Sequence, residues 1–170
     1  MTSRFPRRDE NSVTEFALKL ARLYGPKNKI SRGKIHKYLG MDMDWGTSPG
    51  TMVVLMVKDL AKVIEEFPEV LSSTKASPAA NHLFKIREDR KKLPEELARQ
   101  FHHTTAQLLF LCKQVRPDVE TLVLFLTTRE KEPDEDDWAK LKHRLMYLKG
   151  NLYMKRHTTA DALNIIRYPG

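Results

Sequence analysis

The spacing of apolar residues predicts an amphipathic helix near the start of the chain. In residues 11–25 apolar side chains recur every three or four positions, which places them on one face of a helix. These residues are Val13, Phe16, Ala17, Leu20, Leu23 and Tyr24. Asn11-Ser12 offer an N-cap, and Gly25-Pro26 end the pattern. Residues 1–10 have no period, so we expect a disordered terminus there.

After a basic loop, Lys27–Lys34, the period changes to two. Apolar residues alternate with Gly40, Asp42 and Asp44, which is typical of a strand with one face toward the core. The apolar members are Leu39, Met41, Met43 and Trp45. Turn-forming residues at 46–50 and an apolar run at 52–57 follow. Together these patterns predict a β-hairpin.

A short helix and a long connector follow the hairpin. Apolar residues on one face predict the helix Lys58–Phe67, which Pro68 ends. Residues 69–94 are rich in Ser, Ala, Pro and charge. Connectors of this length are uncommon inside a compact unit, so we expect this one to wrap a surface.

The last third of the sequence predicts three more helices. They begin at Pro94, at Val119 and at Pro133, and Gly150 suits the C-cap of the third. Residues 151–170 form a weakly patterned tail, in which Leu163–Ile166 suit a strand with no evident partner. The predicted fold class is therefore α+β and mainly helical.

Positive charge is concentrated at the N-terminal end. The chain has a formal net charge of +8 and a pI of about 9.6. Residues 1–38 hold ten Lys and Arg against three acids, whereas residues 39–170 hold twenty against nineteen. This distribution favours a polyanionic partner, nucleic acid before a membrane surface. The longest apolar run, Met52–Val57, is far too short to span a membrane.

The cysteine and histidine residues give little sign of chemistry. The chain has one cysteine, Cys112, which excludes an internal disulfide and a cysteine cluster for zinc. We therefore expect a reducing, intracellular location, cytoplasm or nucleus. Cys112 lies on an apolar helix face, which favours a buried thiol over a nucleophile. His102 and His103 are adjacent and would point about 100° apart on a helix, so they do not suit a shared metal.

Two clusters of acidic residues contain the carboxylates that a metal site would need. Asp42 and Asp44, two apart on a strand, would project to one face and could hold magnesium. The same alternation places them toward water, opposite the apolar residues, and we favour this interpretation. The run Asp134–Asp137 lies where a helix begins, so helix capping is favoured there.

Several longer phrases occur in order along the chain. The first are RGKIHKYLGM at 32–41 and ASPAANHLF at 76–84. Then come FHH at 101–103, LLFLCK at 108–113, RPD at 116–118, FLTTR at 125–129, PDEDDW at 133–138 and YLKG at 147–150. Over roughly residues 11–150 these phrases resemble copia-type retrotransposon reverse transcriptases. Several ordered matches at plausible spacing are more specific than any single motif.

The resemblance implies a fragment of an RNA-directed DNA polymerase that covers the primer grip and the thumb or connection. Residues 11–57 would be a palm remnant with a primer-grip-like hairpin, and residues 58–150 a thumb- or connection-like helical module. The hairpin would hold the growing primer end, and the helices would lie along the primer–template duplex. The residues expected to contact nucleic acid are Lys34, Lys37, Tyr38, Leu39, Gly40, Met41, Lys58 and Lys62. Each lysine taken alone is by default a solvated surface charge.

The family's catalytic Y-x-D-D turn would lie before residue 11, where this chain has MTSRFPRRDE. Two-metal phosphoryl transfer needs its carboxylates at a fixed separation. We therefore expect no catalytic or metal-binding residue in this chain, with Mg²⁺ belonging to the parent polymerase. The implied partners are an RNA–DNA or DNA primer–template duplex, weakly bound, and the other polymerase and RNase H domains of the parent polyprotein. No membrane partner is expected.

Two other interpretations stay open. The chain could be a non-catalytic helical interaction protein or an unselected retroelement remnant, and the near-neutral balance of residues 39–170 favours this. A magnesium nuclease that uses Asp42 and Asp44 is the least favoured of the three.

Overall fold

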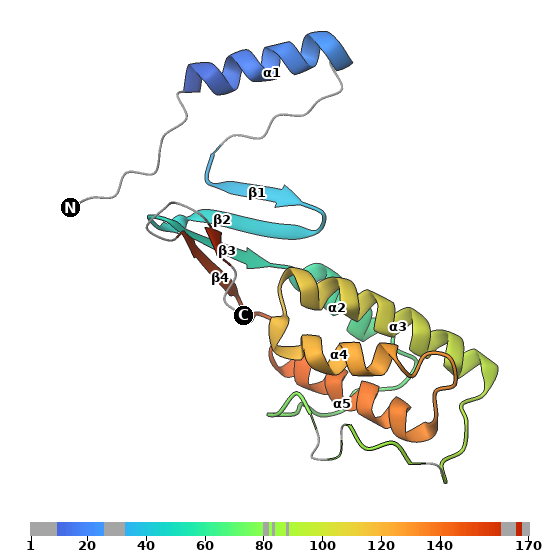
Figure 1. Cartoon of the computed structure of the whole chain (residues 1–170). Coiled ribbons are helices and arrows are strands. Elements are labelled where there is room, and N and C mark those ends of the chain that lie inside the picture. Colours follow the sequence, from blue (N-terminus) through green and yellow to red (C-terminus); the bar gives the residue numbers. More distant parts are fainter. Residues whose placement is uncertain are drawn as a thin grey trace. The chain divides into compact units, whose positions relative to one another are not determined.

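The computed structural model of the chain describes residues 10–25, 33–79, 82, 84–87, 89–160 and 166–167. About half of the structure is helical, and most helices lie in the C-terminal half of the sequence (Figure 1). An antiparallel sheet of four strands, extended by a two-residue fifth strand, accompanies the helices. The predicted α+β class is therefore confirmed.

Contacts group the described residues into two compact units. The first holds the residues up to Tyr38, then Asp42–Val53 and the residues from His157 onward. The second holds Leu39–Met41 and Val54–Arg156. The turn between the strands at 35–38 and 41–48 thus groups with the helical residues, and the described residues from His157 onward group with the sheet.

The strands of the sheet follow one another in chain order. β1 (Ile35–Tyr38), β2 (Met41–Ser48) and β3 (Thr51–Leu55) are neighbours, and β4 (Arg156–Ala160) lies beside β3. A two-residue strand, β5 (Ile166–Arg167), pairs antiparallel with β4. The hydroxyl of Thr158 donates a hydrogen bond to the carbonyl of Met52 at 3.3 Å. The C-terminal part of the chain therefore completes the sheet.

The hairpin predicted from the alternation is present as β2 and β3, but its apolar positions do not form a buried face. Leu39 lies in the turn before β2 and is 60% exposed, and Trp45 is 40% exposed. The expectation that Leu39 and Trp45 face the core is therefore wrong. The alternation counted Leu39 as a strand residue, whereas it lies in the turn before β2. The suggested strand at 163–166 falls mostly outside the described residues.

The first helix, α1 (Glu10–Tyr24), has the predicted position. Ala17 on its apolar stripe is buried, whereas Phe16, Leu23 and Tyr24 are 63%, 72% and 72% exposed. Most of the described stripe is therefore in contact with solvent.

The helical unit packs four α-helices and one short 3₁₀ helix around one core. The helices are α2 (Val57–Glu65), α3 (Glu95–Gln114), η1 (Pro117–Val119), α4 (Glu120–Thr127) and α5 (Glu135–Gly150). The innermost side chains are at most 1% exposed and include Phe101, Leu108, Val123, Leu126, Leu141 and Leu145. These residues recur at helical spacing in α3, α4 and α5, so burial of these apolar stripes holds the unit together. Gly150 is the last residue of α5, and Asn151 is the C-cap.

The connector between α2 and α3 runs along α5, as its length predicted. Side chains of α5 bind its backbone carbonyls at successive points. From the C-terminal to the N-terminal part of α5, these pairs are Lys149 with Leu71 (2.7 Å), His143 with Ser77 (3.0 Å) and Lys140 with Lys85 (2.8 Å). Where α5 begins, a β-bridge joins Lys92 to Asp134. Side chains of α5 thus hold the connector along the helix, and backbone hydrogen bonds hold its end at residues 91–93.

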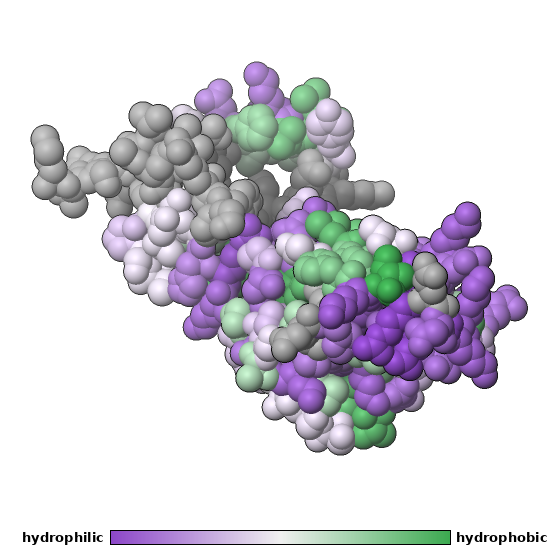
Figure 2. Space-filling model, turned by 60° about the horizontal axis from the view of Figure 1, so that its bottom comes forward, coloured by the Kyte–Doolittle hydropathy of each residue, from purple (hydrophilic) through white to green (hydrophobic). Residues whose placement is uncertain are grey.

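In the described part of the chain no helix is long and apolar enough to cross a membrane. On the face shown in Figure 2, hydrophilic groups alternate with separate apolar groups. Exposed apolar residues include Val70 (86%) and Tyr153 (73%).

Candidate nucleic-acid interface

β1 and β2 form a second hairpin, distinct from the predicted hairpin of β2 and β3, and the turn at the tip of this second hairpin has an unusual backbone. It consists of Leu39 and Gly40, whose φ angles are 48° and 80°. Two successive positive φ angles are the pattern of a type I′ hairpin turn, which normally takes Asn or Gly. Leucine at a positive φ is strained, because its Cβ crowds the backbone. The turn therefore keeps an exposed apolar side chain at a conformational cost.

Gly40 also lies close to side chains at the start of α2. A Cβ at this position would overlap the carboxylate of Asp59 and would lie 3.1 Å from the methyl carbon of Met56. Both neighbours belong to the same unit as the turn: Met56 precedes α2, and Asp59 lies in its first turn. The missing side chain of Gly40 thus lets the start of α2 lie directly against the hairpin tip.

The lysines expected at the interface have different surroundings. Lys37 forms an ion pair with Asp42 at 3.3 Å, and Lys62 pairs with Glu66 at 3.7 Å. Within the described residues Lys34 and Lys58 form no ion pair, and both side chains are exposed. Exposed ion pairs contribute little to stability, so all four ammonium groups are accessible to an anionic ligand.

The structure brings the expected residues together only in part. Lys34, Lys37 and Tyr38 belong to the sheet unit, and Tyr38 is 60% exposed. The others, Leu39, Gly40, Met41, Lys58 and Lys62, belong to the helical unit. Within the helical unit, the contact between Gly40 and Asp59 places the hairpin tip beside α2. Lys58 and Lys62 both belong to α2.

A groove beside this contact contains residues that the sequence did not single out. It lies between α2 and α3, has a volume of about 450 Å³, and is lined by Asp59, Lys62, Val63, His103, Ala106, Gln107, Phe110 and Leu111. Phe110 is 45% exposed and lies off the buried stripe of α3, formed by Phe101, Leu108 and Leu111. The position of Phe110 outside the apolar stripe of α3 was the one sign of this groove that the sequence offered.

Asp42 and Asp44, the possible magnesium ligands, have structural partners. Asp42 pairs with Lys37. Asp44 accepts hydrogen bonds from the amide of Gly46 at 2.6 Å and the hydroxyl of Thr47 at 3.4 Å. Among the described residues no three His, Cys, Asp or Glu side chains gather so that they could hold a metal ion. These contacts give both aspartates a role in the local fold of β2.

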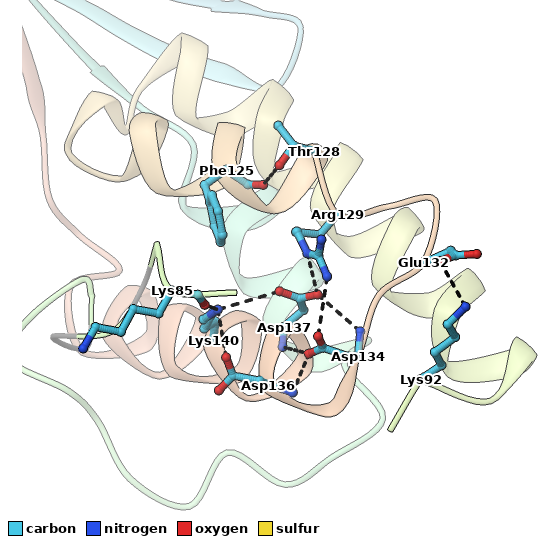
Figure 3. A network of polar contacts seen from close by, with 10 residues as sticks. All are labelled: Lys85, Lys92, Phe125, Thr128, Arg129, Glu132, Asp134, Asp136, Asp137 and Lys140. Carbon is cyan, nitrogen blue, oxygen red and sulfur yellow. Dashed lines mark hydrogen bonds and ion pairs between the residues drawn. The ribbon is translucent and has the colours of Figure 1, made fainter. Parts of the chain in front are cut away.

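The run Asp134–Asp137 caps α5, as predicted. Asp134 accepts hydrogen bonds from the amides of Asp136 and Asp137 at 2.8 and 2.9 Å, and Asp137 accepts from the amide of Asp134 at 3.3 Å. Arg129 binds Asp137 at 3.0 Å, and Lys140 lies 2.9 Å from Asp136 (Figure 3). This capping box and its two cations neutralise the carboxylates locally.

Burial and charge affect these two carboxyl groups differently. Burial alone would raise the pKa of Asp136, but the hydrogen bond and charge of Lys140 outweigh it and lower that pKa. For Asp137 burial prevails over the hydrogen bond from Arg129, so its pKa is raised. The network in Figure 3 therefore serves the fold of the helix start.

Cys112 is buried at 0% exposure, and its thiol donates to the carbonyl of Leu109 at 3.2 Å. Burial, aided by the charge of Glu120, raises the pKa of this thiol to about 11. The thiol therefore stays protonated near neutral pH, which agrees with the predicted inert cysteine.

Comparisons of the chain with protein-family models, with curated proteins and with solved structures find no match.

Proposed function

We propose that this chain is the primer-holding and thumb-like part of a copia-type reverse transcriptase. In the parent RNA-directed DNA polymerase it would grip an RNA–DNA or DNA primer–template duplex, while other domains would supply the catalytic aspartates and Mg²⁺. By itself the chain would bind duplex weakly and would not polymerise nucleotides.

The observation that carries this proposal is the strained, exposed Leu39 at the hairpin tip. A leucine at φ 48° costs of the order of 1–2 kcal/mol and, at 60% exposure, recovers little of this by burial. Folding alone would favour Asn or Gly at this position. A contact outside the chain explains the leucine, and the ordered phrases of the sequence suggest that this contact is a primer strand.

The surroundings of the tip support a nucleic-acid partner. Tyr38 precedes Leu39 and is also 60% exposed. Along the chain, Lys34 directly precedes β1, and Lys37 lies within β1, two residues before Leu39. In the helical unit, Lys58 lies in the first turn of α2, which the tip contacts through Gly40. Exposed apolar and aromatic groups among lysines suit contacts to sugars and bases together with phosphates.

The test is fluorescence anisotropy with a labelled RNA–DNA duplex of random sequence. We expect weak binding with little sequence preference and affinity that falls steeply with salt, with a log–log slope of at most about −3 to −4 if all four lysines lie near phosphates. Lys34→Glu with Lys58→Glu should abolish this binding. The control pair Lys75→Glu with Lys131→Glu makes the same charge change at two other exposed lysines and should retain most of the affinity.

A second candidate is a helical interaction module with no nucleic-acid role. The ion pairs of Lys37 with Asp42 and Lys62 with Glu66 favour it, because each places a carboxylate beside a lysine meant for phosphate. Absent or salt-independent duplex binding would select this candidate. Magnesium-dependent, template-directed nucleotide incorporation by the purified chain would contradict both.

A further inference from the structure

The groove between α2 and α3 combines an apolar floor with a polar rim. Val63 and Leu111 at its base are 4% and 3% exposed, and Phe110 is half exposed at its side. Lys62, Asp59, His103 and Gln107 supply a cation, a carboxylate, an imidazole and an amide around this floor. Gln107 donates to Glu66 at 3.2 Å, which orients its amide. Concave sites with apolar walls and a few fixed polar groups are typical of small-ligand binding.

The size of the groove favours a single flat group over a peptide helix. Its lining extends over one turn of α2, from Asp59 to Val63, and from His103 to Leu111 on α3. The eight helical steps from His103 to Leu111 rise about 12 Å, less than the length of a three-turn partner helix. A volume of about 450 Å³ is ample for one nucleotide.

The groove is continuous with the hairpin tip. Asp59 belongs to the lining of the groove and is also the residue against which Gly40 packs. A strand end held at the tip would therefore lie next to the groove, whose rim includes Lys62. Phe110 offers that nucleotide a ring on which any base can stack.

We propose that this groove binds one unpaired nucleobase at the end of the duplex, stacked on Phe110, with Lys62 near its phosphate and Asp59 and Gln107 at its edge. This inference rests on the proposed function, since it assumes that the neighbouring tip holds nucleic acid. It adds a distinct binding site for a single-stranded nucleotide.

The test compares labelled RNA–DNA duplexes of equal length by anisotropy at one salt concentration. One is blunt, two carry a single adenosine overhang at the 3′ or the 5′ end of the DNA strand, and two carry an abasic overhang instead. We expect at least one adenosine overhang to tighten binding about fivefold or more relative to the blunt duplex. The abasic overhangs should give no gain, because they retain the phosphate without the base.

Two variants test whether the gain in affinity from the adenosine overhang arises in the groove. Phe110→Ala removes the stacking surface, and Ala106→Trp fills the groove from an exposed position; each should abolish the gain while leaving blunt-duplex affinity unchanged. Tyr153→Ala removes an exposed aromatic ring outside the groove and should retain the gain. Circular dichroism confirms that each variant is folded.

The outcomes separate this inference from the proposed function. Blunt-duplex binding without an overhang gain, or a gain that survives both groove variants, overturns the nucleobase site and leaves the proposed function intact. Failure of every duplex to bind overturns the proposed function and the nucleobase site with it.

Discussion

Arg116 and Asp118 are joined by two parallel hydrogen bonds, from Nε to Oδ1 at 2.9 Å and from Nη2 to Oδ2 at 2.7 Å. The arginine is 2% exposed and also donates to the carbonyl of Asn151 at 3.0 Å, while the hydroxyl of Tyr147 donates to Asp118 at 2.9 Å. The pair therefore links the start of η1 to the end of α5. The charged residues of the phrase Arg116-Pro117-Asp118 thus serve the fold of the helical unit.

We predict that Asp118→Asn destabilises the chain by about 3 kcal/mol or more, because it leaves the Arg116 guanidinium buried without a countercharge. The substitution also removes a negative charge that acts on a second buried arginine. Arg144 is 0% exposed and has no hydrogen-bond partner among the described residues. Burial lowers its pKa to about 10, and the charge of Asp118 opposes that shift. Urea unfolding followed by circular dichroism measures the loss. Asp89→Asn at an exposed site should change the free energy of unfolding by no more than about 0.5 kcal/mol.

The effect of Asp118→Asn should depend on pH. Partial burial alone would raise the pKa of Asp118, but the hydrogen bonds and charge of Arg116 and the bond from Tyr147 lower it overall. A lowered carboxyl pKa stabilises the fold above the unfolded value, near 3.9, and this contribution is lost as pH falls through the folded pKa. The difference between wild type and variant should therefore shrink below about pH 4. An equal difference at pH 6 and pH 3 would refute this assignment.

Local patterns were sufficient to predict the helical unit. The stripes containing Leu108, Val123 and Leu141 are buried in α3, α4 and α5, because removing apolar side chains from water stabilises the packed helices. Asp134 caps α5 because its side chain satisfies amides that the helix leaves unpaired. The missed strand β4 has no such local signal: RHTTA has little apolar content, and its pairing beside β3 joins residues about 100 positions apart.

The candidate interface was less predictable from the sequence because it also depends on contacts between residues that are distant along the chain. Lys58 and Tyr38 are visible in a sequence, but the carboxylates that pair with Lys37 and Lys62 depend on side-chain geometry. The groove requires two helices joined by a long connector to pack together, and its lining residues Lys62 and Phe110 lie 48 positions apart. The strained backbone of Leu39 also appears only once the turn is known.

Gly40→Ala should destabilise the chain for two separable reasons. The positive φ of 80° costs about 1 kcal/mol with alanine, and the new Cβ would collide with Asp59. In an Asp59→Ala background the collision is relieved and only the backbone cost should remain. A double-mutant cycle measured by denaturant unfolding should therefore show a coupling of about 1 kcal/mol. Additive effects of the two substitutions would contradict the close approach.

Lys140→Met should release the connector as well as destabilise α5. Lys140 is 4% exposed, lies 2.9 Å from Asp136 and donates to the carbonyl of Lys85 at 2.8 Å. Its loss leaves a buried carboxylate and a carbonyl without their cation, at a cost of about 3 kcal/mol. Limited trypsin digestion should then cut the basic stretch 85–92 faster, as mapped by mass spectrometry. Lys131→Met at an exposed position is the control, and equal cleavage rates in both variants would contradict the anchoring role of Lys140.

Leu39→Asn separates the stability of the hairpin from its proposed use. Asparagine tolerates a positive φ better than leucine, so the free energy of unfolding should rise by about 0.5–1 kcal/mol. The same substitution removes the exposed apolar side chain and should weaken RNA–DNA duplex binding severalfold, with the salt dependence unchanged because no lysine is altered. Denaturant unfolding and anisotropy measure the two effects on one protein. Leu124→Asn is the control, since Leu124 is 42% exposed on α4, in ordinary helical backbone, and should show neither the stabilisation nor the loss of binding. Stabilisation with full duplex affinity would mean that the strained leucine has no part in holding nucleic acid.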